Sequence, residues 1–275
     1  MERGEMEAVT PVLLEETSNA ARADIGDRAP ALPCSPVRPC LHRNPPITPS
    51  SFFGEHRYLL LAIGAIFSFL AFAAAISNGW LLLQWDEPIQ RLVEDNRNGA
   101  LDTFFLTASR FGSTIVVLSL GALFSVLTWS RCRAVSIAFA VATLGRPLIE
   151  FVLKVVVGRD RPDLERMVNG HGPSFPSGHV MAAVALWGLM PLVVGLFTRS
   201  RLLWWASAVG SALMILSIAA SRVYLGVHWP SDVTAGLLLG SFFLLGVEAV
   251  VAHTHRVTRG CVGREHATGA PTRAS

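Results

Sequence analysis

Long apolar stretches separated by short polar segments dominate the chain from residue 58 onward. Six of these stretches contain few or no charged residues: 58–84, 102–129, 134–157, 180–198, 202–221 and 233–247. About twenty helical residues cross the roughly 30 Å hydrocarbon layer of a bilayer, so each stretch is close to the length of a span. The pattern predicts an all-α, polytopic membrane protein with six transmembrane helices.

The polar segments divide the chain into three parts. Residues 1–52 lack apolar periodicity and hold eight of the sixteen prolines, which predicts a disordered, Pro-rich tail. Residues 53–253 form the predicted six-helix membrane domain, and 254–275 form a basic tail. Within the domain, segment 85–100 starts with acidic residues and Pro88 and ends near Gly99, as expected of a short interfacial helix.

Composition supports the membrane assignment. Hydrophobic residues make up 51% of the 275 residues and charged residues 16%, compared with about 25% charged residues in ordinary soluble domains. This balance excludes a cytosolic enzyme and a secreted disulfide scaffold. The net charge of +3 is small and dispersed, so we expect the membrane, and no nucleic acid, as a partner.

Arginines in the short loops predict the orientation of the chain. If both termini lie on one side, that side also receives Arg57, Arg131, Arg133, Arg199, Arg201, Arg256 and Arg259. Cytoplasmic loops carry an excess of Lys and Arg, so the pattern places both termini in the cytoplasm. We therefore expect a multi-pass protein of the plasma membrane, with segments 85–100, 158–178 and 222–232 on the extracytoplasmic side.

The unusual polar residues gather on that outer side, at the ends of the third to sixth stretches. Lys154, Arg161 and Arg222 are three cations near one interface, and Lys154 is the only lysine beside 22 arginines. Guanidinium groups bind phosphate oxygens bidentately, and a lysine supplies a compact charge. A single such residue could be a snorkelling anchor. Three together with two histidines favour a phosphate site, because charges in membranes are costly.

Two more charges, Arg146 and Glu150, lie in the stretch that carries Lys154. Their spacing of four residues predicts an ion pair on one helix face, with Lys154 one turn further along. The pair could support Lys154, but a purely structural pair is the more common way for a bilayer to accommodate such groups.

The segment Pro176-Ser177-Gly178-His179 begins the fourth stretch. Ser177 suits a helix N-cap, and Gly178 lets the backbone approach a ligand closely. The free N–H groups of a helix N-terminus bind anions, and a histidine in the first turn can protonate a leaving oxygen. An ordinary helix start with a chance histidine is the alternative.

His228 and Asp232 are four residues apart at the start of the sixth stretch, so a helical turn would bring them to one face. The carboxylate can then accept from one ring nitrogen and leave the other free as a nucleophile. Asp232 is expected to raise the pKa of His228. A structural pair that caps the helix is the alternative.

Three ordered motifs resemble those of the type 2 phosphatidic acid phosphatase superfamily, in its bacterial membrane branch: Lys154-x6-Arg161-Pro162, Pro176-Ser177-Gly178-His179 and Ser221-Arg222-x5-His228-x3-Asp232. The resemblance implies that His228 forms a phosphohistidine with help from Asp232, and that His179 protonates the leaving group. It also implies that the phosphoryl oxygens are held by Lys154, Arg161, Ser177, Gly178 and Arg222. Neither a metal ion nor another cofactor is expected.

The leading hypothesis is therefore a membrane phosphatase that hydrolyses a lipid phosphate or pyrophosphate. Polyprenyl pyrophosphate, phosphatidic acid and phosphatidylglycerol phosphate are the substrates implied by the family. A lipid phosphotransferase that uses the same histidine is the alternative. A proton-coupled transporter is less favoured, because transporters usually place such groups near the midplane of the bilayer.

Overall fold

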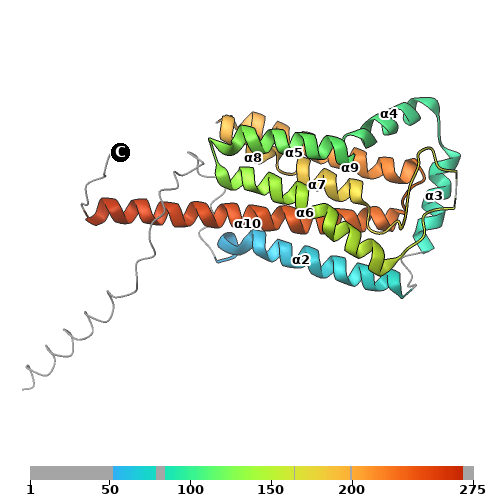
Figure 1. The fold of residues 1–275 in the computed structure, drawn as a ribbon, viewed down its shortest axis with the longest axis horizontal. Helices are drawn as coiled ribbons and strands as arrows, with labels where there is room; N and C mark the ends of the chain where they lie inside the picture. Colours follow the sequence, from blue (N-terminus) through green and yellow to red (C-terminus); the bar gives the residue numbers. More distant parts are fainter. Residues whose placement is uncertain (1–51, 79–83, 164, 199, 269–275) are drawn as a thin grey trace, which may run out of the picture. The chain divides into compact units, whose positions relative to one another are not determined.

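The computed structural model describes residues 52–78, 84–163, 165–198 and 200–268, and all regular secondary structure in these ranges is helical. Figure 1 shows the helices: α2 (Phe52–Ser77), α3 (Asp86–Asp95), α4 (Gly99–Arg110), α5 (Thr114–Trp129), α6 (Arg133–Val157), α7 (Gly178–Trp187), α8 (Met190–Phe197), α9 (Arg201–Tyr224) and α10 (Pro230–Thr268). The predicted tail 1–52 falls almost entirely outside these residues, and α10 continues past the predicted boundary at residue 254.

The predicted six-span architecture is confirmed. Within the described residues, five segments are long and apolar enough to cross a membrane: Arg57–Ser77, Arg133–Val157, Gly178–Phe197, Arg201–Tyr224 and Pro230–Ala249. Helices α4 and α5 meet the same criteria together, which gives six spans when this bent pair is counted as one. The short helix expected in segment 85–100 is found as α3.

The second span differs from the continuous stretch expected over 102–129. Helices α4 and α5 meet at an angle of 48°. The break has a local cause, because the side chain of Ser113 accepts a hydrogen bond from the backbone N–H of Val116 and so caps a new helix. Helix α4 turns toward the end of α9, where the hydroxyl of Tyr224 donates to Asp102 at 2.6 Å.

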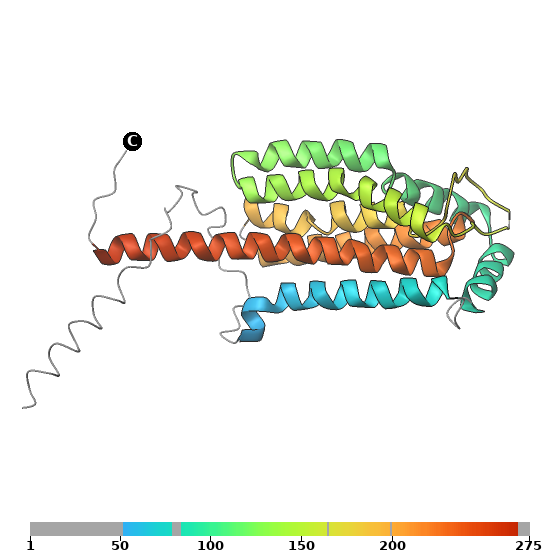
Figure 2. The same cartoon turned by 60° about the horizontal axis from the view of Figure 1, so that its bottom comes forward.

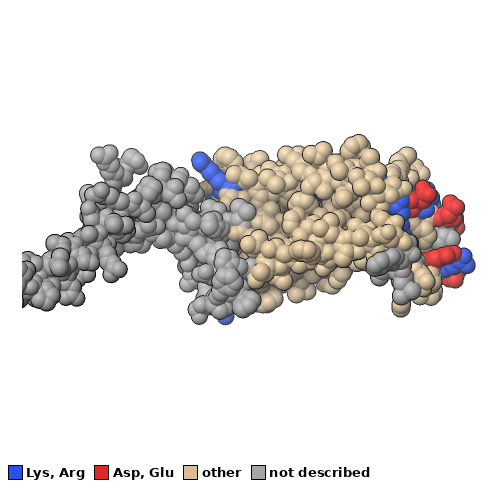
Figure 3. Space-filling view, turned by 90° about the horizontal axis from the view of Figure 1, so that it is seen from below, with Lys and Arg blue, Asp and Glu red and all other residues tan. Residues whose placement is uncertain are grey.

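Helix α7 lies inside the bundle and contacts α5, α6, α9 and α10. Phe139 and Leu186 belong to a buried cluster between α5, α6 and α7, and Met181 packs with residues of α2 and α10. Figure 2 shows α2 running along α10 on one side of the bundle. The outer faces are apolar, and the flank in Figure 3 shows charged side chains only at its two ends. This distribution suits a surface surrounded by lipid.

Two glycines let α7 and α10 approach each other closely. A Cβ atom at Gly236 would lie 2.9 Å from the carbonyl oxygen of Ser177, and one at Gly240 would lie 2.8 Å from Cβ of Val184. Small residues four apart are a common contact surface between membrane helices. The close packing brings the first turn of α7 next to the first turn of α10, where the candidate site lies.

Candidate active site

The structure brings all eight predicted site residues to the end of the bundle that faces α3 (Figure 1). They come from five places: the end of α6 (Lys154), the loop 158–177 (Arg161 and Ser177), the start of α7 (Gly178 and His179), the end of α9 (Arg222), and the turn into α10 (His228 and Asp232). Helices separated in sequence therefore supply one cluster of two histidines, one carboxylate and three cations.

His228 is held in the tight turn between α9 and α10. Its backbone N–H donates to the carbonyl of Arg222 at 3.3 Å, and its side chain is only 3% exposed. The two ring nitrogens face different partners. Nδ1 lies 3.6 Å from Oδ2 of Asp232, and Nε2 lies 3.5 Å from Nη1 of Arg161. The predicted pairing of His228 with Asp232 is thus found as a close electrostatic contact.

Asp232 is fully buried, and other groups hold both of its carboxylate oxygens. Oδ2 accepts from the backbone N–H of Trp229 at 3.0 Å, which caps the first turn of α10. Oδ1 accepts from Nη1 of Arg159 at 2.7 Å. The carboxylate therefore cannot rotate freely, and one of its oxygens is fixed on the side of His228.

The net pKa of His228 differs from the expectation based on its spacing from Asp232. The pKa of His228 is lowered to about 4, chiefly by burial of the imidazole and also by the charges of Arg222 and Arg161. The interaction with the carboxylate of Asp232 raises the pKa but does not outweigh burial. His228 is therefore neutral at pH 7, as a nitrogen nucleophile must be.

Helix α7 begins where the sequence predicts, but the predicted side-chain cap is not formed. Ser177 is the N-cap residue, yet its side chain makes no capping hydrogen bond and its buried hydroxyl has no partner among the described residues. Its backbone N–H donates to the carbonyl of Asp232 at 3.1 Å. A hydroxyl group in this setting is free to donate to an anion at the helix N-terminus.

Gly178 is approached closely by a side chain of the protein itself. A Cβ atom there would lie 2.0 Å from Oε1 of Glu150. The same carboxylate pairs with Nζ of Lys154 at 2.7 Å and with Arg146, which also donates to the carbonyl of Gly178 at 3.1 Å. The predicted pair of Arg146 and Glu150 is confirmed, and it links Lys154 to the first turn of α7.

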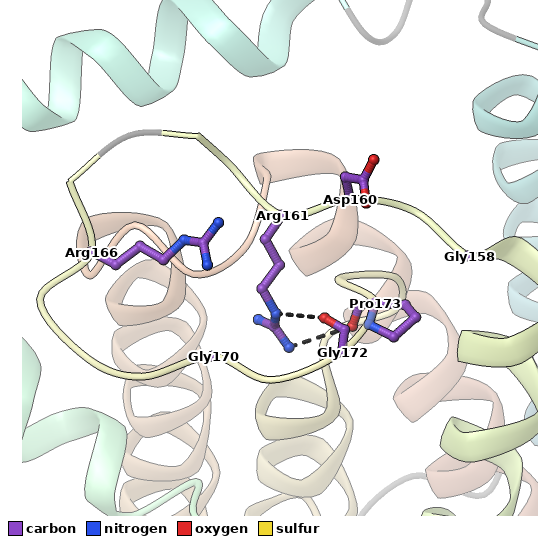
Figure 4. A pocket seen from close by; sticks show the side chains of 7 residues that line it. All are labelled: Gly158, Asp160, Arg161, Arg166, Gly170, Gly172 and Pro173. Carbon is purple, nitrogen blue, oxygen red and sulfur yellow. Dashed lines mark hydrogen bonds between the residues drawn. The ribbon is translucent and has the colours of Figure 1, made fainter.

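The guanidinium of Arg161 is anchored by loop carbonyls. Nη1 donates to Val227 at 2.6 Å, and Nε donates to Gly172 at 2.9 Å. Burial lowers the pKa of Arg161 from its ordinary value. Figure 4 shows this side chain beside an open cavity of about 380 Å³, lined by Gly158, Asp160, Arg161, Arg166, Gly170, Gly172 and Pro173.

Arg222 is the most enclosed of the three predicted phosphate-binding cations. Its Nη1 donates to the hydroxyl of Ser109 at 2.5 Å, and its buried Nε has no partner among the residues that the structure describes. Nδ1 of His228 is also a buried polar atom without a hydrogen bond to those residues. Buried polar groups are usually hydrogen-bonded, so the unpaired Nε of Arg222 leaves a donor available to an anion.

Sequence reasoning missed Arg159, which touches Asp232, and Asp86, which touches Arg159 at 2.7 Å. In the sequence, Asp86 is marked only as an acidic residue at the start of a helix. Arg159 occupies one of the six unspecified positions between Lys154 and Arg161. The one sequence feature that pointed to a contact between Asp86 and Arg159 is that segments 85–100 and 158–178 were expected on the same side of the membrane.

The comparisons with known proteins cover the part of the chain that holds these residues. The model of the PAP2 superfamily matches residues 133–256, which include all eight predicted site residues. A decaprenylphosphoryl-5-phosphoribose phosphatase of Mycobacterium tuberculosis is 30% identical over 137 residues, covering 48% of this chain and 71% of the relative. The chain belongs to the PAP2 superfamily. The resemblance found in its three motifs is confirmed.

Two further comparisons cover a larger share of the chain. An undecaprenyl-diphosphatase of Sulfolobus acidocaldarius is 27% identical over 196 residues, covering 68% of this chain and 88% of the relative. The crystal structure of a transmembrane PAP2 type phosphatidylglycerolphosphate phosphatase from Bacillus subtilis superposes with a TM-score of 0.63 at 25% identity, covering 68% of this chain and 94% of that one. This protein is thus a multi-pass membrane protein of a lipid phosphatase family.

Proposed function

We propose that this PAP2 protein hydrolyses a lipid phosphate or pyrophosphate through a phosphohistidine at His228, on the extracytoplasmic face of the plasma membrane. The arrangement of the His228 ring carries the proposal. Nδ1 faces the carboxylate of Asp232, and Nε2 faces the guanidinium of Arg161. A ring with its proton on Nδ1 would direct the lone pair of Nε2 toward the cations that bind phosphate.

In the first step, Nε2 of His228 attacks phosphorus and the bond to the leaving oxygen breaks. His179 donates a proton to that oxygen, and Asp232 stabilises the positive charge that develops on the His228 ring. In the second step, water attacks the phosphorus, His179 takes up a proton of that water, and the bond from phosphorus to Nε2 breaks. Phosphate leaves, and both histidines return to their starting states.

The phosphoryl oxygens would be held by the five remaining residues of the predicted site. Lys154, Arg161 and Arg222 supply positive charge, and the hydroxyl of Ser177 and the backbone of Gly178 supply donors at the N-terminus of α7. These three cations can neutralise the charge of the transition state, so we propose a mechanism that is independent of metal ions. Because the cluster lies at the end of a membrane bundle, a substrate with its tail in the bilayer can reach it.

Phosphate release by the purified protein tests this function. We expect release from at least one member of a panel of polyprenyl pyrophosphate, phosphatidic acid and phosphatidylglycerol phosphate, without an added acceptor and in the presence of EDTA. If release required an alcohol acceptor, the protein would be a phosphotransferase. Activity that was lost in EDTA and restored by Mg²⁺ would contradict the metal-independent mechanism.

The pH dependence follows from the low pKa of His228. A nucleophilic ring must be neutral, and burial lowers the pKa of the free enzyme's His228 to about 4. Activity should therefore persist well below the ordinary pKa of histidine, about 6.5, and fall only as the pH approaches 4. The measurement is kcat/KM against pH, with a substrate whose own ionisation is known. An acid limb that follows a pKa near 6.5 and does not belong to the substrate would contradict this assignment.

The proposed sidedness can be tested with single cysteines in a background that lacks Cys34, Cys40, Cys132 and Cys261. Asn169 lies in the loop next to the site, and Ser130 lies between α5 and α6; both are exposed. A membrane-impermeant thiol reagent should label Asn169→Cys in intact cells and Ser130→Cys only after lysis. The reverse pattern would place the site in the cytoplasm. Ser130 is preferred to the native Cys132, which is buried.

A further inference from the structure

A second charged cluster lies behind the carboxylate of Asp232. The guanidinium of Arg159 bridges two carboxylates: Nη1 donates to Oδ1 of Asp232 at 2.7 Å, and Nη2 donates to Oδ2 of Asp86 at 2.7 Å. Ser231 completes the cluster, because its backbone N–H donates to Oδ1 of Asp86 at 2.9 Å and its hydroxyl contacts both Asp86 and Arg159.

The cluster is nearly closed to solvent. Asp86 is 3% exposed, and 14% of the Arg159 side chain is accessible. A buried charge is costly unless it is paired and hydrogen-bonded. Here one cation serves two anions, and Ser231 supplies further donors to Asp86. Loss of Asp86 would leave Arg159 with Asp232 as its only carboxylate partner among the described residues.

This connection reaches the site from outside the part of the chain that matches the family model. Asp86 is the first residue of α3, whereas the match begins at residue 133. The first turn of α3 also contains Glu87, which is exposed and pairs with Arg91 on the surface of the same helix. The buried aspartate and the exposed glutamate are therefore neighbours in sequence with opposite surroundings.

We propose that Asp86 and Arg159 are positioning residues, which hold Asp232 with one oxygen directed at Nδ1 of His228. Arg159 occupies Oδ1 of Asp232, so only Oδ2 is available on the side of the imidazole. Asp86 in turn holds the guanidinium of Arg159 in place, so that the positive charge of Arg159 is divided between the carboxylates of Asp86 and Asp232. The inference rests on the proposed function, because it assumes that His228 and Asp232 act in the reaction.

Replacing Asp86 and replacing Arg159 should shift the pKa of His228 in opposite directions. The charged or titratable groups that face the imidazole are Asp232 on α10, Arg222 on α9, Arg161 in the loop and His179 on α7. Asp86→Asn leaves the full charge of Arg159 on Asp232, which then stabilises a cationic His228 less well. Arg159→Gln releases Asp232 to interact with His228 alone. The acid limb of activity should move to lower pH in the first variant and to higher pH in the second.

The experiment compares full-length wild type, Asp86→Asn, Arg159→Gln and the double variant in detergent, with one lipid phosphate as substrate. We expect each single variant to lower kcat roughly ten- to hundredfold, with KM within about twofold. The acid limbs of kcat/KM should shift in opposite directions by about half a pH unit or more. Because Asp86 acts through Arg159, the double variant should lose no more activity than Arg159→Gln alone.

Glu87→Gln and Arg91→Gln are the matched controls, since they remove the exposed ion pair of the same helix. Both should retain wild-type kcat and pH dependence. Thermal unfolding of every variant separates misfolding from misplacement of Asp232. If Asp86→Asn fails to fold, Arg159→Lys tests the same point, because it keeps the charge but cannot bridge both carboxylates, and it should lower kcat at unchanged KM.

The outcomes separate this inference from the proposed function. If wild type and the Glu87→Gln control release no phosphate, the proposed function is wrong. If they are active and folded Asp86→Asn matches them in kcat and in its acid limb, the positioning role is overturned. Shifts of both acid limbs in the same direction, or additive losses in the double variant, would also overturn it and leave Asp86 as a residue that docks α3.

Discussion

His228→Ala should reduce phosphate release to background, a loss of at least about 10⁴-fold in kcat. In the proposed mechanism the new bond to phosphorus forms at Nε2, and none of the other described site residues is assigned as a nucleophile. His179 is the proton donor in that mechanism, and the hydroxyl of Ser177 has no adjacent base assigned to it. Residual activity would therefore come only from direct attack of water on a phosphate group bound by the cations.

The measurement pairs steady-state phosphate release with trapping of a radiolabelled phosphoenzyme. Phosphohistidine is acid-labile and stable to base, so wild type should give a label with that signature and His228→Ala should give none. His253→Ala, a histidine change on α10 beyond the span that ends at Ala249, is the control and should behave as wild type. A folded His228→Ala protein that retained near-normal turnover would contradict the role of His228 as nucleophile.

Gly178→Ala should lower kcat/KM by at least about tenfold, equivalent to about 1.4 kcal/mol. The added Cβ would lie 2.0 Å from Oε1 of Glu150, so the glutamate must move. A glutamate end can usually move at little cost, but this one pairs with both Lys154 and Arg146. Displacing it therefore shifts Lys154 away from its place beside the helix N-terminus, with a larger effect on activity than on stability.

Gly145→Ala is the matched control on α6. A Cβ atom at Gly145 meets nothing within 4 Å, so the change should leave activity intact and stabilise the helix by up to about 1 kcal/mol. Activity of both variants is measured with the same lipid phosphate, and stability by thermal unfolding in detergent. Equal activity of Gly178→Ala and wild type would show that Glu150 and Lys154 can rearrange without affecting phosphate binding.

The sequence predicted the spans because a bilayer imposes one simple requirement, a long apolar helix. It did not predict the 48° break between α4 and α5. The two helices together are apolar enough to count as one span, so hydropathy does not mark the break. The capping hydrogen bond of the Ser113 side chain shows that a second helix begins there. Apolar content therefore predicts where the chain crosses the membrane better than how each crossing is built.

The three motifs predicted the site for a similar reason. Residues close in sequence at helix ends, such as His228 and Asp232, are brought together by local geometry. The contact of Arg159 with Asp86 joins residues 73 positions apart and depends on how α3 docks, which local spacing does not encode. The pKa of His228 was misjudged for the same reason, because its burial is a property of the assembled bundle.

The charged stripe on α6 also has a consequence for how the protein is made. Arg146 lies in the middle of the 25-residue helix, with Glu150 and Lys154 on the following turns. A charged side chain at the centre of an isolated membrane helix costs about 2.5–3.5 kcal/mol. Glu150 offsets part of this cost within α6, but Arg146 gains its hydrogen bond to the carbonyl of Gly178 only when α7 is in place. Biosynthesis should therefore favour release of α6 and α7 from the insertion machinery into lipid as a preassembled hairpin.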